Sequence, residues 1–347
     1  MGDTRRTRAY IGSFTSAGGR GVLVAEVEPE TGALELVGAS DAVADPSFLA
    51  LGPGAEVLYA VSETAEGAAA ALDVTGPEPR LLGAPVPVDG SGPTHLAVTA
   101  GHVLTANYTS GSVSVLPAAA DGSLKPVTGV VRHEGSGPVE RRQEGPHAHQ
   151  VLPDPSGRWV LAVDLGADSV TIWALDPGTG SLHPHGTTAL RSGTGPRHLA
   201  FHPDGAHAYV LNELEPTVTV CRWDADTGVL EALGETPVVP ADATGDRYPS
   251  EVVVAPDGRF LWAAVRGHDT LAVLALDAGG AEARLVASVP CGGHWPRDLT
   301  LDPSGRHLYA ANERSGDVTW FTVDPETGLP VRTGSVPAPA ASCVVLA

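Results

Sequence analysis

The chain has 347 residues, a formal net charge of −20 at pH 7 and three cysteines. A strongly negative chain repels nucleic-acid phosphates at long range, so we expect no nucleic-acid partner. No apolar run approaches transmembrane length and the opening segment Met1–Arg8 is polar, so we expect neither a membrane anchor nor a signal peptide. Cys221, Cys291 and Cys343 are odd in number, which indicates free thiols and predicts a cytoplasmic protein.

A proline-led phrase typical of β-strands recurs six times along the chain. The copies begin at Pro46, Pro93, Pro146, Pro196, Pro249 and Pro296. They follow one another at intervals of about 50 residues, a period that is typical of the four-stranded blades of a β-propeller. Most copies contain a Pro/Gly turn between their first two strands, at Asp154–Gly157, Pro203–Gly205, Pro256–Gly258 and Asp302–Gly305. No segment of useful length has a helical period, which predicts an all-β fold.

A seventh copy is divided between the two ends of the chain. Ser342–Ala347 match only the first strand of the phrase, whereas Arg8–Phe14 and Gly21–Leu34 match its remaining strands. Pairing the two ends would close the ring and leave no open sheet edge. We therefore predict a single domain over residues 1–347, a seven-bladed β-propeller with four-stranded blades, in which 8–34 and 342–347 complete one blade.

Aligned repeats place polar side chains at two equivalent positions. The first inner strands begin with Ser47, His95, His147, His149, Arg197, Glu251 and Arg297. The second strands end with Ser13, Glu63, Tyr108, Leu165, Glu213, Arg266 and Glu313. We expect both sets near the same mouth of the central channel. Water in a channel is enough to favour polar residues, but histidines, arginines and glutamates from four successive blades at one end indicate a binding site.

Three phrases resemble a known family. They are Arg141–His149 (RRQEGPHAH), Gly195–Gly205 (GPRHLAFHPDG) with Asn212-Glu213-Leu214, and Arg266–Asp269 (RGHD). Together they are similar to the seven-bladed lactonase family, which includes bacterial 6-phosphogluconolactonases and fungal carboxymuconate-lactonising enzymes, and the resemblance covers essentially the whole chain. Two positions depart from the family pattern, Val265 and Asp298, where asparagine is usual.

The resemblance implies that His149, Arg197, Glu213 and Arg266 are catalytic. Around them the aligned repeats predict substrate contacts from His147, His95, Tyr108, Glu251, Arg297 and Glu313. An imidazole or carboxylate can deprotonate the water that attacks a lactone carbonyl, and an arginine can stabilise the oxyanion or bind an anionic substituent. Either Glu213 or His149 could be the base. Arg197 could instead be a structural ion-pair partner, and Arg266 could mainly fix a turn with Asp269.

Other histidines are interpreted differently. His198, His202 and His207 are expected to be packing or turn residues. His147 and His149, with His133 upstream, could bind a metal, but zinc needs three or four ligands in a closed geometry and no Cys-x-x-Cys or His-Glu-x-x-His motif accompanies them. We predict no metal and no other cofactor.

The leading hypothesis is metal-independent hydrolysis of a sugar-acid lactone, with 6-phosphogluconolactone as the preferred substrate. A second is lactone formation or another ring reaction on the same scaffold, and a third is a non-catalytic propeller that binds a ligand or protein. The expected partner is a small anionic lactone, bound by a monomer or weak homo-oligomer.

Overall fold

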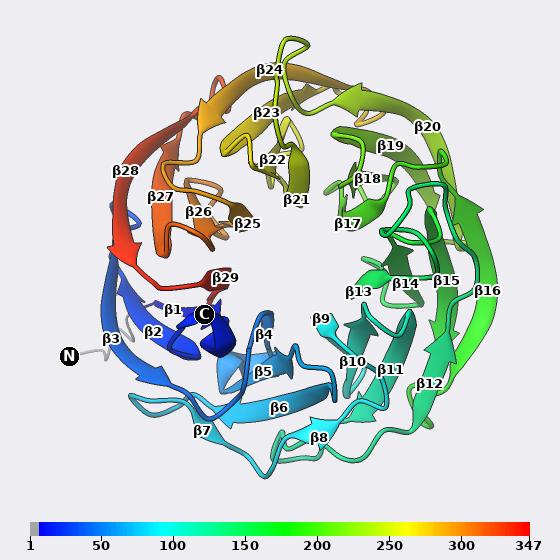
Figure 1. Cartoon of the computed structure of the whole chain (residues 1–347), viewed down its shortest axis with the longest axis vertical. Coiled ribbons are helices and arrows are strands. Elements are labelled where there is room, and N and C mark those ends of the chain that lie inside the picture. Colours follow the sequence, from blue (N-terminus) through cyan, green and yellow to red (C-terminus); the bar gives the residue numbers. More distant parts are fainter. Residues whose placement is uncertain (1–6) are drawn as a thin grey trace.

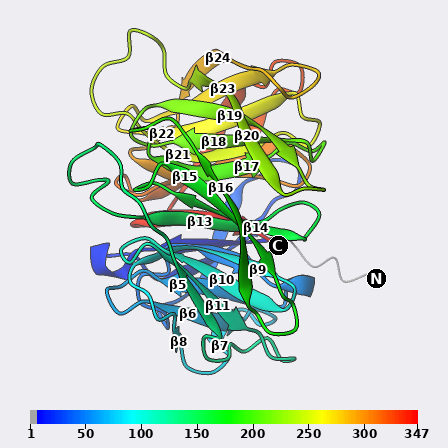
Figure 2. The ribbon, with the colours of Figure 1, turned by 90° about the vertical axis from the view of Figure 1, so that its right-hand side faces the viewer.

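The computed structural model describes residues 7–347, so most of the polar opening segment lies outside the described residues. Seven sheets stand in a ring around a central channel, as predicted (Figure 1). Seen from the side, connecting loops lie on both faces of the ring (Figure 2). We number the blades in chain order, and the first strand given for each blade lines the channel.

The first four blades contain these strands. Blade 1 is β29 (Ala341–Leu346), β1 (Arg8–Ser13), β2 (Val22–Val27) and β3 (Leu34–Ser40). Blade 2 is β4 (Leu49–Leu51), β5 (Val57–Ser62) and β6 (Ala68–Asp73), with an outer edge divided into β7 (Arg80–Leu81) and β8 (Val86–Pro87). Blade 3 is β9 (Pro93–Thr99), β10 (His102–Asn107), β11 (Ser112–Pro117) and β12 (Gly129–Arg132). Blade 4 is β13 (Ala148–Pro153), β14 (Trp159–Asp164), β15 (Ser169–Leu175) and β16 (Leu182–Ala189).

The last three blades have outer strands of eight or nine residues, as long as that of blade 4 or longer. Blade 5 is β17 (Pro196–Phe201), β18 (His207–Asn212), β19 (Thr217–Asp224) and β20 (Val229–Pro237). Blade 6 is β21 (Tyr248–Val254), β22 (Phe260–Arg266), β23 (Thr270–Leu276) and β24 (Ala283–Pro290). Blade 7 is β25 (Pro296–Leu301), β26 (His307–Asn312), β27 (Asp317–Val323) and β28 (Pro330–Pro337).

Helical structure in residues 7–347 is limited to two single turns of 3₁₀ helix, η1 (Thr15–Ala17) and η2 (Pro53–Ala55). No helix in this range is long and apolar enough to cross a membrane. The predicted Pro/Gly turns between first and second strands are confirmed. Gly157 and Gly305, for example, have φ values of 71° and 72°, which a residue with a Cβ rarely adopts.

The two ends of the described chain form one blade. β29 pairs antiparallel with β1, with Ile11 opposite Val344 and Tyr10 opposite Val345. The predicted closure is therefore confirmed, with different bounds. The blade extends to Ser40, because Leu34 begins its outermost strand β3 rather than ending the blade. Only its first residue, Leu34, is fully buried, so the sequence of that strand carries little of the apolar pattern on which the prediction rests.

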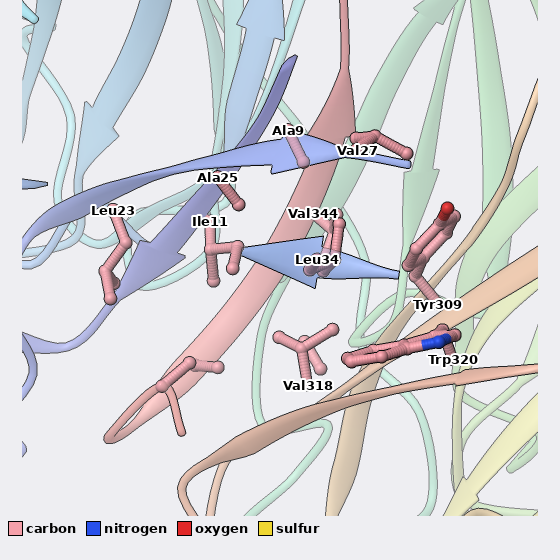
Figure 3. Packing of buried hydrophobic residues seen from close by; sticks show 13 residues of the cluster. Ala9, Ile11, Leu23, Ala25, Val27, Leu34, Tyr309, Val318, Trp320 and Val344 are labelled. Carbon is pink, nitrogen blue, oxygen red and sulfur yellow. The ribbon is translucent and has the colours of Figure 1, made fainter. Parts of the chain in front are cut away.

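The hydrophobic core is divided into clusters between neighbouring blades. One cluster joins blade 1 to blade 7: Ile11, Leu23 and Val344 pack against Val318 and Trp320 (Figure 3). Equivalent clusters join each of the other neighbouring pairs around the ring. Each blade therefore buries both faces against its neighbours, and the ring requires every blade to be complete.

Inner strands carry a β-bulge close to one end of the channel in six of the seven blades. In blade 5, for example, Pro196 pairs with Asn212 and His198 with Leu211, so Arg197 has no partner in the ladder. The residues left unpaired in this way are Thr94, His149, Arg197, Ser250 with Glu251, Arg297 and Ser342. A bulge places an extra residue opposite one partner and redirects side chains, so two consecutive residues can both point into the channel.

Removing residues 342–347 should destabilise the ring. The truncation deletes most of β29, leaves β1 without its inner neighbour and removes Val344 from the cluster in Figure 3. We expect the melting temperature to fall by about 10 °C or more, since several kcal/mol of packing and pairing are lost. Thermal melting followed by circular dichroism tests this. Deletion of Ala347 alone is the control, and equal melting of both truncated forms would contradict the closure argument.

Candidate active site

Two layers of side chains fill the channel near its bulged end. The outer layer consists of the first unpaired residue of each bulge, which includes His149, Arg197 and Arg297. The next layer, which we call the waist ring, has one residue from each blade: Phe48, His95, Gln150, His198, Glu251, Asp298 and Cys343. All of these except His198 line a cavity of about 480 Å³ that continues along the channel toward Asp302 and Pro303 at the opposite end.

Glu213 is the centre of a buried ion cluster at the bulged end. Its Oε2 lies 2.7 Å from Nη2 of Arg266 and 3.3 Å from Nε of Arg197, and its Oε1 accepts a hydrogen bond from Arg142. Only 4% of Glu213, 2% of Arg197 and 6% of Arg266 is exposed. One carboxylate thus faces three guanidinium groups from neighbouring parts of the ring.

The cluster fixes the charge of its members. Burial alone would raise the pKa of Glu213, but Arg266, Arg197 and Arg142 outweigh it and lower that pKa to about 2. Burial and the neighbouring Arg266 and Arg297 lower the pKa of Arg197 to about 9, so Arg197 still carries its charge at neutral pH. Glu213 is therefore ionised throughout the physiological range and is a weak base.

Backbone carbonyls of blade 6 orient the arginines. Arg266 donates from Nε to the carbonyl of Tyr248 at 3.1 Å and from Nη2 to that of Pro249 at 3.3 Å, while Arg197 donates to the carbonyl of Ser250. Such contacts hold the planar groups in one orientation before a ligand arrives. In the RGHD segment, Asp269 accepts the amide hydrogen of Gly267 in the turn, while Arg266 itself faces Glu213.

Arg297 is held on the other side of the mouth. Its guanidinium lies 3.4 Å from Oε2 of Glu63 and 3.6 Å from Oε2 of Glu313, and 5.0 Å from the ring centre of Phe14. The mouth therefore contains four arginines and three glutamates in ion pairs. This local balance differs in sign from the strongly negative chain as a whole.

His149 and Tyr108 complete the constellation. The His149 ring stands edge-on to Tyr108 with centroids 5.5 Å apart, and the Tyr108 hydroxyl bonds Arg142. His147 stacks on Tyr108 at 4.5 Å, and its Nδ1 bonds the Tyr108 carbonyl at 2.9 Å. Burial and the charges of Arg197 and other nearby groups keep the pKa of His149 well below its ordinary value, so His149 is neutral.

A line of hydrogen bonds leads from His149 into the waist ring. Nδ1 of His149 lies 3.1 Å from Nε2 of His198, and Nδ1 of His198 lies 2.6 Å from Oε2 of Glu251. Glu251 is also hydrogen-bonded to Asp298, whose Oδ2 accepts the amide of Val344 at 2.9 Å. Burial raises the pKa of Glu251 to about 7, and burial with the neighbouring Glu251 raises that of Asp298 well above its ordinary value.

The structure brings the four residues predicted as catalytic to one end of the channel. It also places Tyr108, His147, Arg297 and Glu313 there. His95 and Glu251 differ from the expectation, because they lie one layer deeper and line the far cavity. The reason is the bulge: in each of the six bulged inner strands, the residue that follows the first unpaired one belongs to the waist ring, so residues that align closely in sequence divide between two layers.

Sequence reasoning missed three residues of the site. Arg142 lies in an irregular loop, where no strand pattern marks it, although it is part of the RRQEGPHAH phrase. In the sequence, Asp298 stands out only as a departure from the family pattern. His198 packs against Phe48 and His95 as predicted, but it also joins His149 to Glu251, which the sequence does not indicate. His202 and His207 both bond Asp204 in a turn, as predicted.

Val265, the other departure, changes a structural contact. The equivalent residues Asn107, Asn212 and Asn312 end second strands and donate from their amides to hydroxyls of the third strand, for example from Asn212 to Thr219 at 2.9 Å. Val265 makes no such bond and is fully buried. Its neighbour Arg266 nevertheless reaches Glu213.

Potential metal ligands are engaged elsewhere. His133 bonds Asp164 at 2.6 Å, and His147 bonds a backbone carbonyl. Within residues 7–347 there is no group of three or more His, Cys, Asp or Glu side chains placed to hold a metal ion.

Comparison with known proteins assigns the chain to a family. The model of a family described as "Lactonase, 7-bladed beta-propeller" matches residues 8–346. The chain belongs to this family. Membership supports lactone hydrolysis and the enzyme that we predicted, rather than a non-catalytic binding propeller.

Relatives agree over the whole length. A 6-phosphogluconolactonase of Bacillus subtilis (strain 168) is 35% identical over 342 residues, which cover 96% of this chain and 97% of the relative. The crystal structure of a putative 6-phosphogluconolactonase from Bacteroides fragilis has a TM-score of 0.93 at 27% identity, over 100% of this chain and 99% of that one. A periplasmic gluconolactonase of Pseudomonas aeruginosa has a TM-score of 0.90 at 29% identity, over 98% of both chains.

Glu213→Gln should lower stability at neutral pH. A carboxyl whose pKa falls from 4.5 unfolded to about 2 folded contributes on the order of 3 kcal/mol above pH 4.5, and this contribution is lost as pH falls toward 2. Urea unfolding at neutral pH should show a loss of that order, and the gap from wild type should shrink in acid. Glu63→Gln is the control, since Glu63 is partly exposed and, among residues 7–347, forms an ion pair with Arg297 alone. An equal loss of unfolding free energy in both variants would show that the three arginines around Glu213 stabilise the fold no more than a single partly exposed ion pair does.

Proposed function

We propose that the protein hydrolyses a sugar-acid lactone, with 6-phosphogluconolactone as its preferred substrate, by attack of water on the ring carbonyl. The proposal rests mainly on one observation: a neutral, buried histidine stands beside a cluster of fixed arginines at the mouth of the channel. The names of the relatives support the substrate class.

His149 is the proposed base. The pKa of Glu213 is about 2, so Glu213 would take a proton from water poorly. The pKa of His149 lies well below its ordinary value, which keeps its imidazole unprotonated at neutral pH. Among residues 7–347, no group hydrogen-bonds to Nε2 of His149, so that nitrogen is available to a water molecule. We therefore assign the base to His149 and an electrostatic role to Glu213.

Arginines supply the charge that the reaction needs. The tetrahedral adduct of a lactone carries an oxyanion, which a guanidinium in a water-poor site stabilises strongly. Arg197 and Arg266 lie deep in the mouth and suit this role, since backbone carbonyls orient both. Arg142, whose side chain is 34% exposed, stands further out and suits the substrate phosphate. Glu213 leaves these groups with an excess of positive charge while keeping them close together.

Compartment and assembly also remain proposals. We propose a cytoplasmic location, supported by three buried cysteines that form no disulfide within the described chain. The relation to a periplasmic gluconolactonase makes this a point to measure. We further propose a monomer or weak homo-oligomer without a nucleic-acid partner, consistent with a net charge of −20.

Turnover of two lactones tests the function. We expect freshly prepared 6-phosphogluconolactone to be hydrolysed with a kcat/KM about 10-fold or more above that for unphosphorylated gluconolactone, because the arginine-rich mouth can bind the phosphate. Proton release, corrected for spontaneous hydrolysis, measures both. Equal values for the two lactones would refute the phosphate preference, and no turnover of either would refute hydrolysis.

Variants separate the proposed base from general charge effects. His149→Gln should lower kcat for the better substrate by about 10²-fold or more while preserving a hydrogen-bonding side chain. Arg158→Gln is the control for a substitution to glutamine that removes a positive charge away from the mouth, since Arg158 is an exposed residue of the opposite rim, where it bonds Ala225. This variant should hydrolyse both lactones with wild-type kcat and KM.

Activity should survive removal of divalent metals. The proposed chemistry needs only the imidazole and the arginines, and the candidate metal ligands His133 and His147 are bonded to other groups. After exhaustive treatment with EDTA and gel filtration, kcat and KM should match the untreated enzyme. Loss of activity that one added divalent ion restores would overturn the metal-independent mechanism.

A further inference from the structure

The waist ring contains a hydrogen-bonded line that the hydrolysis described above leaves unexplained. It runs from His149 in blade 4 to His198 in blade 5, Glu251 in blade 6 and Asp298 in blade 7. All four residues are at least nine-tenths buried, with exposed fractions of 5%, 2%, 8% and 6%. Burying two carboxyl groups and two imidazoles is costly, so a line of this kind needs a reason.

Hydrogen-bond polarity along the line can be deduced from its far end. Two carboxyl groups in contact cannot both be ionised, and Asp298 has the more strongly raised pKa, so Asp298 holds the proton and Glu251 is the carboxylate. Glu251 accepts the amide of Val252 at 3.0 Å through Oε1 and faces Nδ1 of His198 with Oε2. A carboxylate only accepts, so Nδ1 of His198 must carry a hydrogen.

The same logic then fixes His149. A neutral His198 with its hydrogen on Nδ1 presents a lone pair at Nε2, and this atom faces Nδ1 of His149 at 3.1 Å. Nδ1 of His149 must therefore donate, which leaves Nε2 of His149 as the basic nitrogen. The line thus selects the tautomer in which the atom without a protein partner is the base.

His149 also needs a way to pass a proton on. Arg197 and His198 from blade 5, Arg266 from blade 6 and Arg297 from blade 7 all disfavour a positive charge on its ring, and Tyr108 from blade 3 flanks it. An imidazolium there would be strongly destabilised, so the histidine alone would be a weak base. Glu251, which faces Arg197, His198 and Asp298, is placed one layer farther from the mouth and can take the charge instead.

We propose that His198, Glu251 and Asp298 form a proton relay that sets the tautomer of His149 and stores the proton that His149 takes from water during lactone hydrolysis. As water attacks, its O–H bond breaks, the oxygen bonds the carbonyl carbon and the proton goes to Nε2 of His149. Nδ1 of His149 passes its hydrogen to Nε2 of His198, and Nδ1 of His198 passes its hydrogen to Oε2 of Glu251.

Charge and atoms balance through the cycle. Both histidines stay neutral, Glu251 becomes a carboxylic acid, and the adduct carries the negative charge beside the arginines. When the ring C–O bond breaks, the relay runs in reverse and Nε2 of His149 returns the proton to the leaving oxygen. The product acid then ionises into solvent. Asp298 keeps its proton throughout and acts as a positioning residue, since its hydrogen bond orients the Glu251 carboxylate.

Kinetics of two relay variants test the proposal, which rests on the proposed lactone hydrolysis. Glu251→Gln keeps the shape but cannot take up a proton, and His198→Phe keeps an aromatic ring without nitrogens. Each should lower kcat by about 10²-fold with KM changed less than about threefold, and the double variant should lose no more than the worse single variant. Cys343→Ala, another waist-ring residue outside the line, is the matched control and should retain wild-type kcat.

The pH profile provides a reading that a packing role would not change. Glu251 must be ionised to accept the proton, so wild-type kcat should fall below a pKa of about 7. In Glu251→Gln this acid limb should move to lower pH, because the fall in kcat then follows protonation of His149, whose pKa is lowered. Wild-type kcat in both variants, or an acid limb unmoved in Glu251→Gln, would overturn the relay.

Nitrogen NMR of histidine-labelled protein decides the relay independently of any substrate. We expect His149 and His198 both to be neutral with the hydrogen on Nδ1 at about pH 9, well above the pKa of Glu251, with assignments made from His149→Gln and His198→Phe. A hydrogen on Nε2 of either ring, or an imidazolium, would overturn the relay even if lactone hydrolysis is found. If these tautomers are observed but no lactone is hydrolysed, the proposed function fails and the hydrogen-bonded line stands.

Discussion

The attraction of three guanidinium groups for one buried carboxylate is the interaction on which the channel mouth depends. Arg142, Arg197 and Arg266 come from separate parts of the chain and would repel one another if Glu213 were absent. Removing one partner of a buried ion pair generally costs far more than the pair itself gains. Glu213 is therefore what permits positive groups to gather where an anionic substrate would enter, in a chain that is otherwise strongly negative.

Register within the inner strands decides what each side chain can do. Strict alternation would send Arg197 and His198 to opposite faces of the sheet. The bulge at Arg197 breaks this alternation, so the two side chains lie in two layers of the same channel. Arg197 belongs to the ion cluster and His198 to the waist ring. Blades 4 and 7 repeat the device at His149 and Arg297. The fold thus obtains two functional layers from strands that are only six residues long.

The architecture was predictable from the sequence because it rests on long-range periodicity. The spacing of the prolines and the divided seventh copy gave the blade count and the closure of β1 by β29, and turn glycines such as Gly157 gave the hairpins. The ion cluster was predictable in part, since Glu213 and Arg266 end equivalent strands. The hydrogen-bonded line was not, because no sequence pattern marks a bulge, and His198 beside Arg197 resembles an ordinary alternating strand residue. Arg142 reaches the site from a loop, where periodicity carries no information.

Closure of the ring by β29 also has a consequence for biosynthesis. Ribosomes make the chain from β1 onward, so β1–β3 leave the exit tunnel long before the strand that completes their sheet. Blades 2 to 7 can stack in order as they emerge, but the inner edge of β1 stays unpaired until residues 341–346 have been made. An exposed edge of this kind can bind other strands. The nascent chain therefore exposes an aggregation-prone strand edge in its first blade through most of its synthesis. Protection of that edge by chaperones would matter more for this protein than for a propeller whose blades are each contiguous in sequence.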